Sequence, residues 1–180
     1  MAVKRKQTRS EIALRRLERV LHEAEGEIPR ALVRMPDDAV KETERIEESM
    51  RRLERLSWSE KFTMAIDPKT DRYMLDALSR DEDAYVRFYV IGNENVSVEM
   101  LERLSRDKDA YVRREVAWNR NVSVEILERL SRDEDAGVRR EVARSENVSV
   151  EILERLKNDS DKYVRNIAIK TLKKLKRSNC

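Results

Sequence analysis

The chain has 180 residues, of which 42% are charged, and it carries only three glycines, three prolines and one cysteine, Cys180. So few glycines and prolines exclude a flexible low-complexity chain, and a single cysteine excludes both a disulfide framework and an all-cysteine metal site within the chain. No apolar run reaches the length of a transmembrane helix, and the basic start lacks the apolar segment of a secretory signal, so we expect a cytoplasmic protein without membrane contact. The abundance of Lys, Arg and Glu is also typical of proteins from hyperthermophiles.

Residues 1–56 do not repeat and are predicted to form two helices. The segment "TRSE" (Thr8 to Glu11) fits a capping box, and Gly26 fits the end of the helix that follows it. A second helix is predicted to begin near Asp37, with apolar residues at the heptad spacing. The simplest arrangement is a helical hairpin that covers the end of a repeat array. The alternative is a coil through which the chain forms a homo-oligomer.

From residue 57 onwards the sequence repeats with a period of 26 residues. The segment "NVSVE" occurs three times at this spacing, and residues 95–120 differ from residues 121–146 at only six positions. A fainter copy lies upstream, so about four repeats cover residues 57–180. One such unit cannot bury its own apolar face, whereas stacked copies can. The sequence therefore predicts an all-α fold, an α-solenoid of about four two-helix repeats with the N-terminal hairpin as its cap.

Each repeat is predicted to contain two short helices. Helix A, as in "SVEILERLSRD", begins after a serine, and helix B, as in "DAYVRREVA", begins after an aspartate; both residue types are favoured N-caps. On helix A, Val98, Leu101 and Leu104 fall on one predicted core face. The opposite face is predicted to be a solvated lattice of i,i+4 ion pairs such as Glu99–Arg103.

One arginine lies in the middle of the apolar arc of each helix B. A buried guanidinium without partners would be very costly, so Arg113 must have acidic partners. Aspartates recur before each such arginine, and we expect one to pair within its own repeat and another to pair across to the next. The predicted Asp–Arg ladder comprises Arg87, Arg113, Arg139, Arg165, Asp81, Asp83, Asp107, Asp109, Asp133 and Asp135. The functional alternative is a row of arginines that binds phosphates.

The segment "DKDAYVRREVAWNRNVSVEILERLSRD" resembles the leucine-rich repeat variant, a family of short HEAT-like helical repeats. The signature is Asp-x-Asp-x-x-Val-Arg-x-x-Val-Ala-x-Asn followed by a capped helix with Leu-x-x-Leu, and the resemblance covers residues 57 to about 172. It implies a right-handed superhelix and no shared catalytic activity. The family usually carries proline between the helices, which only Asp67-Pro68 keeps here. Some relatives hold an iron–sulfur cluster on N-terminal cysteines, but no cysteine precedes Cys180, so no cofactor is implied.

The face of helix B opposite its core changes from repeat to repeat, while the other positions hardly change. We call this the variable face, and its predicted partner-binding residues are Tyr85, Phe88, Tyr89, Tyr111, Arg114, Trp118, Arg140, Arg144 and Tyr163. It holds six of the nine aromatic residues, and exposed Tyr, Trp and Arg are enriched at binding hot spots. The variable face therefore predicts a binding or scaffold module whose partner is a protein. The alternative is that Tyr111 and Trp118 pack against a neighbouring helix or the N-terminal hairpin.

No catalytic, cofactor-binding or metal-binding residues are predicted. His22 is the only histidine, and no glycine-rich phosphate loop is present. Two basic ends flank an acidic middle, which makes nucleic-acid binding through these ends and the exposed arginines the second hypothesis. An enzyme like the HEAT-like DNA glycosylases is the third hypothesis, and fold analogy alone supports it.

Overall fold

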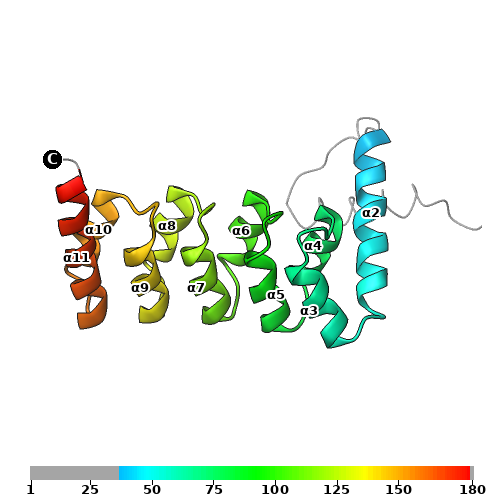
Figure 1. The fold of residues 1–180 in the computed structure, drawn as a ribbon, viewed down its shortest axis with the longest axis horizontal. Helices are drawn as coiled ribbons and strands as arrows, with labels where there is room; N and C mark the ends of the chain where they lie inside the picture. Colours follow the sequence, from blue (N-terminus) through cyan, green and yellow to red (C-terminus); the bar gives the residue numbers. More distant parts are fainter. Residues whose placement is uncertain (1–36, 179–180) are drawn as a thin grey trace, which may run out of the picture.

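The computed structural model describes residues 37–178, and within this range the chain is entirely helical apart from short links (Figure 1). The helices are α2 (Asp37–Leu53), α3 (Trp58–Ile66), α4 (Arg72–Leu78), α5 (Ala84–Ile91), α6 (Val98–Leu104), α7 (Ala110–Trp118), α8 (Val124–Leu130), α9 (Ala136–Arg144), α10 (Val150–Leu156) and α11 (Lys162–Ser178). None of these helices is both long and apolar enough to cross a membrane.

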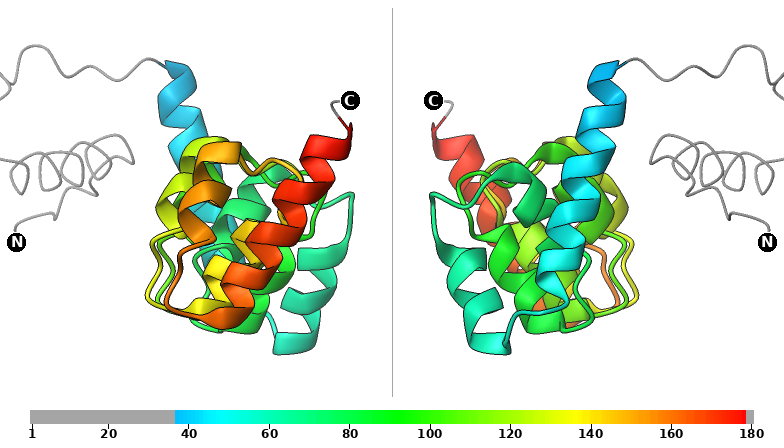
Figure 2. Two further views of the ribbon diagram at one scale, coloured as in Figure 1. Left: turned by 90° about the vertical axis from the view of Figure 1, so that its left-hand side faces the viewer. Right: turned by 90° about the vertical axis from the view of Figure 1, so that its right-hand side faces the viewer.

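The helices of the repeats form two layers in an extended array (Figures 1 and 2). Helices α3, α5, α7, α9 and α11 lie side by side, each in contact with the next. Helices α4, α6, α8 and α10 form the second layer, and each contacts the helix that follows it in the chain. Each of these pairs is one helix A followed by one helix B. The chain is therefore the α-solenoid-like repeat array that the sequence predicts.

Serine and aspartate caps begin the helices where the sequence predicts them. The side chain of Ser97 accepts a hydrogen bond from the Met100 N–H, and that of Asp109 accepts one from the Tyr111 N–H. Ser123 and Asp135 cap α8 and α9 in the next repeat. Because these caps satisfy N–H groups at each helix start, a helix A of seven residues can follow directly on a short link.

The core lies between the two layers and is continuous along the array. Leu101 and Leu104 of helix A and Val112 and Val116 of helix B are almost completely buried. Equivalent residues of the neighbouring repeats belong to the same core, so each repeat buries its apolar face against the next.

Val98 does not lie on the core side of helix A, contrary to the sequence analysis. Its side chain is exposed, as are those of Val124 and Val150 at the same position of later repeats. Val98 directly follows the Ser97 cap, so it is the first helical residue and lies at the edge of the packed layer. The preceding apolar residue, Val96, is buried in its place.

Helix α2 packs along α4, at the end of the array opposite α11 (Figure 1). Leu53 in its last turn is buried in the core. Nη1 of Arg45 also lies 3.2 Å from the hydroxyl of Tyr73 on α4 and donates to it. The first predicted helix lies outside the described residues, so the hairpin formed by residues 1–56 stays a prediction.

Candidate partner-binding surface

Arginines of helix B form bidentate ion pairs with aspartates of the following repeat. Nε and Nη2 of Arg113 donate to Oδ2 and Oδ1 of Asp133, at 2.7 and 2.8 Å. The same two-bond geometry joins Arg87 to Asp107 and Arg139 to Asp159. Both partners of each pair are largely buried. These are the strongest kind of side-chain hydrogen bond, and they link successive repeats.

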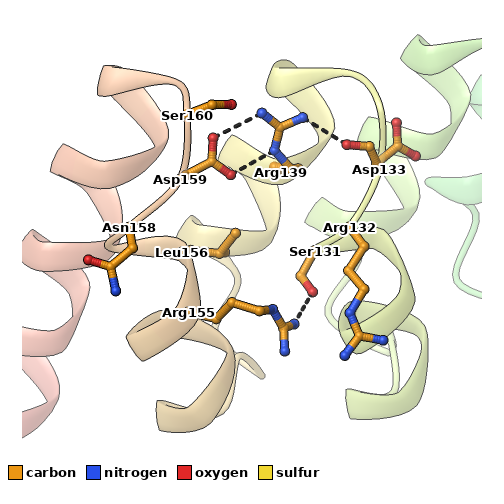
Figure 3. A pocket seen from close by; sticks show the side chains of 9 residues that line it. All are labelled: Ser131, Arg132, Asp133, Arg139, Arg155, Leu156, Asn158, Asp159 and Ser160. Atoms are coloured by element: carbon orange, nitrogen blue, oxygen red, sulfur yellow. Dashed lines mark hydrogen bonds and ion pairs between the residues drawn. The ribbon is translucent and has the colours of Figure 1, made fainter.

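Within its own repeat each arginine contacts a backbone carbonyl, not an aspartate side chain. Nη1 of Arg113 donates to the carbonyl of Asp107 at 2.8 Å. Figure 3 shows the equivalent Arg139 between Asp133 and Asp159, with the carboxylate of the following repeat on one side. The expected side-chain pair within one repeat is therefore wrong. The remaining aspartates of the predicted ladder have a different role, as N-caps of helix B: Asp83, Asp109 and Asp135.

The two ends of the ladder differ from its middle. On α3, which precedes the first complete repeat, Lys61 takes the arginine position, and its Nζ donates to Asp81 at 2.7 Å. The sequence analysis missed Lys61, although it stands one period before Arg87. At the other end, Nη1 of Arg165 donates to the carbonyls of Asp159 and Ser160.

Hydrogen bonds within the ladder shift the pKa values of several of its members towards the charged form. Hydrogen bonds from Arg139 lower the pKa of Asp159 despite its partial burial. Burial alone would raise the pKa of Asp107, but hydrogen bonds from Arg87 and from the Asp109 N–H lower it overall. The hydrogen bond to Asp133 raises the pKa of Arg113. These shifts favour the charged forms of Asp107, Asp159 and Arg113, and the ladder arginines already hold a carboxylate where a phosphate would have to bind.

A second row of ion pairs connects each helix A to the next. Nη1 and Nη2 of Arg129 donate to Oε1 and Oε2 of Glu102 at 3.0 and 2.9 Å, and Nη2 also donates to the hydroxyl of Ser105. Arg155 makes the equivalent contacts to Glu128 and Ser131. These arginines are only half-buried, so their pairs are more screened by water than the ladder.

This second row corrects the predicted lattice of i,i+4 pairs. Arg103 was expected to pair with Glu99, but it donates to Asp76 at 2.7 Å and to the hydroxyl of Ser79 in the preceding repeat. The i,i+4 pair Glu102–Arg106 does form, at 2.7 Å, between α6 and the turn that follows it. The charged face of helix A is therefore partly a seam between repeats and not simply a solvated surface.

The variable face carries large aromatic side chains that no described residue covers. Tyr85 and Tyr111 are each 69% exposed, Trp118 is 61% exposed and Tyr163 is 57% exposed. They come from α5, α7 and α11, the layer of B helices. Arg144 is exposed on α9, and Arg140 is partly buried beside it. Among residues 37–178, no helix therefore buries Tyr111 or Trp118.

Phe88 and Tyr89 are less accessible than the sequence analysis expected. The Tyr89 ring lies edge-on to Phe62 at 4.6 Å between centroids, and Phe88 lies edge-on to Tyr89 at 5.3 Å. Trp58 stacks on Phe62 at 5.6 Å and is itself exposed. Aromatic side chains therefore extend the variable face onto α3. The sequence analysis missed this extension, although Phe62 stands one period before Phe88.

A hollow of about 330 Å³ opens in the middle of the variable face. We call it the Trp118 hollow, and it is lined by Phe88 on α5, by Tyr111, Arg114, Glu115 and Trp118 on α7, and by Glu141 on α9.

Gly137 makes room for one wall of the Trp118 hollow. The guanidinium carbon of Arg114 lies 5.5 Å from the centroid of the Tyr111 ring. A Cβ at Gly137 would come within 3.3 Å of Arg114 and within 2.7 Å of Asp135. The equivalent position of the other repeats is a tyrosine, as in Tyr85, Tyr111 and Tyr163. Glycine stands at position 137 because the long Arg114 side chain reaches from α7 to this place in the next repeat.

The two carboxylates of the Trp118 hollow belong to Glu115 and Glu141, which stand one period apart on the variable face. Neither is among the partner-binding residues predicted from the sequence. Glu141 lies 2.8 Å from Nη1 of Arg144 and 4.0 Å from Nη2 of Arg114. The carboxylate of Glu115 makes no hydrogen bond or ion pair with the described residues. Burial and the nearby charge of Glu141 raise the pKa of Glu115, against a smaller lowering by Arg114. Glu115 is therefore a half-buried acidic group that has no direct ion pair among the described residues.

No protein-family model matches the chain, and no curated protein is significantly similar to it. The sequence and the structure together define a short helical repeat protein with periodic ion pairs between its repeats.

Proposed function

We propose that the chain is a non-catalytic binding module that recognises a protein partner through the variable face. The observation that carries the proposal is the pair of exposed aromatic side chains, Tyr111 and Trp118, on the rim of a hollow. The rest of the repeat is used for stacking, through the core and the two rows of ion pairs. The in-phase signature further supports membership of the leucine-rich repeat variant, with a right-handed superhelix.

The chemistry of the variable face favours a protein over a nucleic acid. Tyr, Trp and Arg are the residues that most often dominate protein interfaces. Glu115 and Glu141 lie among them and would repel a phosphate backbone. The buried arginines of the ladder, which could otherwise form a phosphate-binding row, are already paired with aspartates.

The test is capture of binding proteins from cells that produce the chain. The wild type is compared with a Tyr111→Ala, Trp118→Ala double variant and with a matched double variant on helix A, Val124→Ala, Glu125→Ala. All four side chains are exposed, so we expect all three proteins to melt within a few degrees of one another. We expect the wild type and the helix A variant to capture the same partner and the variable-face variant to lose it. Capture of that partner by all three proteins would contradict the proposal.

Nucleic-acid binding is separated from protein binding by a gel shift across a salt series. Contacts to several phosphates weaken steeply as salt rises. Tight, salt-sensitive binding to DNA or RNA that survives the loss of Tyr111 and Trp118 would favour the basic ends of the chain as the site instead.

A further inference from the structure

We propose that the Trp118 hollow binds the side chain of an arginine that the partner protein presents. The inference rests on the proposed function, because it names the chemical group that the variable face recognises. It assigns Glu115 as the carboxylate that receives the guanidinium, with Trp118 and Phe88 as aromatic walls.

The Glu115 carboxylate has no hydrogen-bond donor among the described residues. Elsewhere in the array half-buried carboxylates between repeats are held by a guanidinium, as Glu102 is by Arg129 and Asp133 is by Arg113. Glu115 lies on α7, two residues after Arg113, and is partly buried, yet it has no such contact among the described residues. A partly desolvated carboxylate without a hydrogen-bond donor is unfavourable, so a donor that enters the hollow gains an unpaired acceptor.

The second argument is the balance of charge. Among the described residues, Arg114 is the one basic residue that lines the hollow, and it lies against the Tyr111 ring and extends towards Glu141 at 4.0 Å. Glu141 raises the pKa of Glu115 by more than Arg114 lowers it, so of these two neighbours the acidic one has the larger effect on Glu115. A cation that reaches the Glu115 carboxylate is therefore attracted to it.

The third argument is the shape of the group that fits. An arginine guanidinium is planar, stacks on aromatic faces and donates two parallel hydrogen bonds to one carboxylate. The hollow offers Trp118 and Phe88 as aromatic surfaces, with the Glu115 carboxylate beside them. Its volume of about 330 Å³ is at the small end for ligand pockets and suits one long side chain. A lysine would supply the charge but neither the plane nor the paired donors.

The experiment begins with selection of random peptides displayed on phage against the full chain. The wild type is expected to enrich peptides with a shared arginine. The Glu115→Gln variant is expected to lose the enrichment of arginine, whereas the matched surface variant Glu125→Gln is expected to keep it. The Glu115→Gln change keeps the size of the side chain, removes its charge and replaces one acceptor oxygen by an NH2 donor. Thermal melting is used to confirm that the fold is intact.

The pairing itself is measured with one selected peptide and its citrulline analogue, which replaces the guanidinium by a neutral group of the same shape. In the wild type, citrulline is expected to weaken binding by about tenfold or more, the usual size of a charge-assisted hydrogen bond. In Glu115→Gln the same replacement is expected to change affinity by less than about twofold, because the partner charge is already absent. In the wild type, a lysine analogue is expected to bind with an affinity between those of the arginine peptide and the citrulline peptide.

The outcomes separate this inference from the proposed function. If the selected peptides need Tyr111 and Trp118 but show no preference for arginine, or if citrulline costs the same in both proteins, the arginine site is wrong and the binding face stands. If binding survives the Tyr111→Ala, Trp118→Ala double variant, or if no peptide is enriched over that variant, both proposals are wrong.

Discussion

Arg113 links two repeats by itself. Its guanidinium holds Asp133 of the following repeat and the carbonyl of Asp107 in its own, and its side chain is only 10% exposed. We expect Arg113→Ala to lower the free energy of unfolding by about 3 kcal/mol or more, because Asp133 would remain partly buried without its counter-charge. Urea unfolding measures this loss.

The control for Arg113 is Arg120→Ala, an exposed arginine in the link that follows α7. Its loss should change the unfolding free energy by less than about 0.5 kcal/mol. Similar losses for the two variants would show that the ladder does not hold the repeats together. Arg103 is unsuitable as a neutral control, since it contacts Asp76 and Ser79 across a seam.

Glu115 should make the stability of the chain fall as pH rises. Burial and Glu141 raise its pKa in the folded state, so between the usual glutamate pKa and this raised value the folded chain binds more protons than the unfolded chain. Stability is therefore lost as pH rises through that window. We expect Glu115→Gln to melt above the wild type at pH 7 and to match it at a pH below the usual glutamate pKa. A stabilisation that is the same at both pH values, or absent at both, would contradict an unpaired Glu115.

At the scale of helices, the residue at which each helix starts can be predicted from local sequence signals. The ion-pair partners of its side chains cannot. The caps Ser97 and Asp109 are where the sequence predicts them because a cap bonds to N–H groups two or three residues away. Arg103 could reach Glu99 within its helix or Asp76 in the preceding repeat, and a helical wheel does not distinguish them. The way in which neighbouring repeats pack determines the partner of Arg103, which is Asp76.

The Trp118 hollow was only half predictable for the same reason. Tyr111, Arg114 and Trp118 stand out because they break the repeat, and they are exposed or partly exposed in the structure. Whether Glu115 and Glu141 line the same hollow depends on how α7 and α9 pack against each other. A wheel of one helix therefore shows that Glu115 shares the variable face but not that it lacks a partner.

Helix α2 is expected to protect the first repeat. It packs along α4 and buries Leu53, so its removal would expose apolar surface at that end of the array. We expect the fragment 57–180 to melt earlier than the full chain or to aggregate, as measured by thermal melting and sedimentation. If residues 1–56 are an independent coil instead, the fragment 57–180 remains monomeric and the fragment 1–56 dimerises alone.

Over the whole molecule, the features that vary and the features that repeat lie on different surfaces. The ladder, the second row of ion pairs and asparagine contacts such as Asn93 to the carbonyl of Ala65 recur from repeat to repeat and join neighbours only. Such an array can change one surface of each repeat without disturbing the stacking. The aromatic residues of the variable face lie on that surface, which is why we assign binding to it.

The most direct measurement of this claim is the accessibility of Trp118 to acrylamide in the free chain and in the complex with its captured partner. In a Trp58→Phe variant, Trp118 is the only tryptophan. Because its side chain is 61% exposed, we expect strong quenching of its fluorescence in the free chain. The account predicts that a saturating amount of partner largely suppresses this quenching. A complex in which Trp118 is quenched as strongly as in the free chain would contradict it.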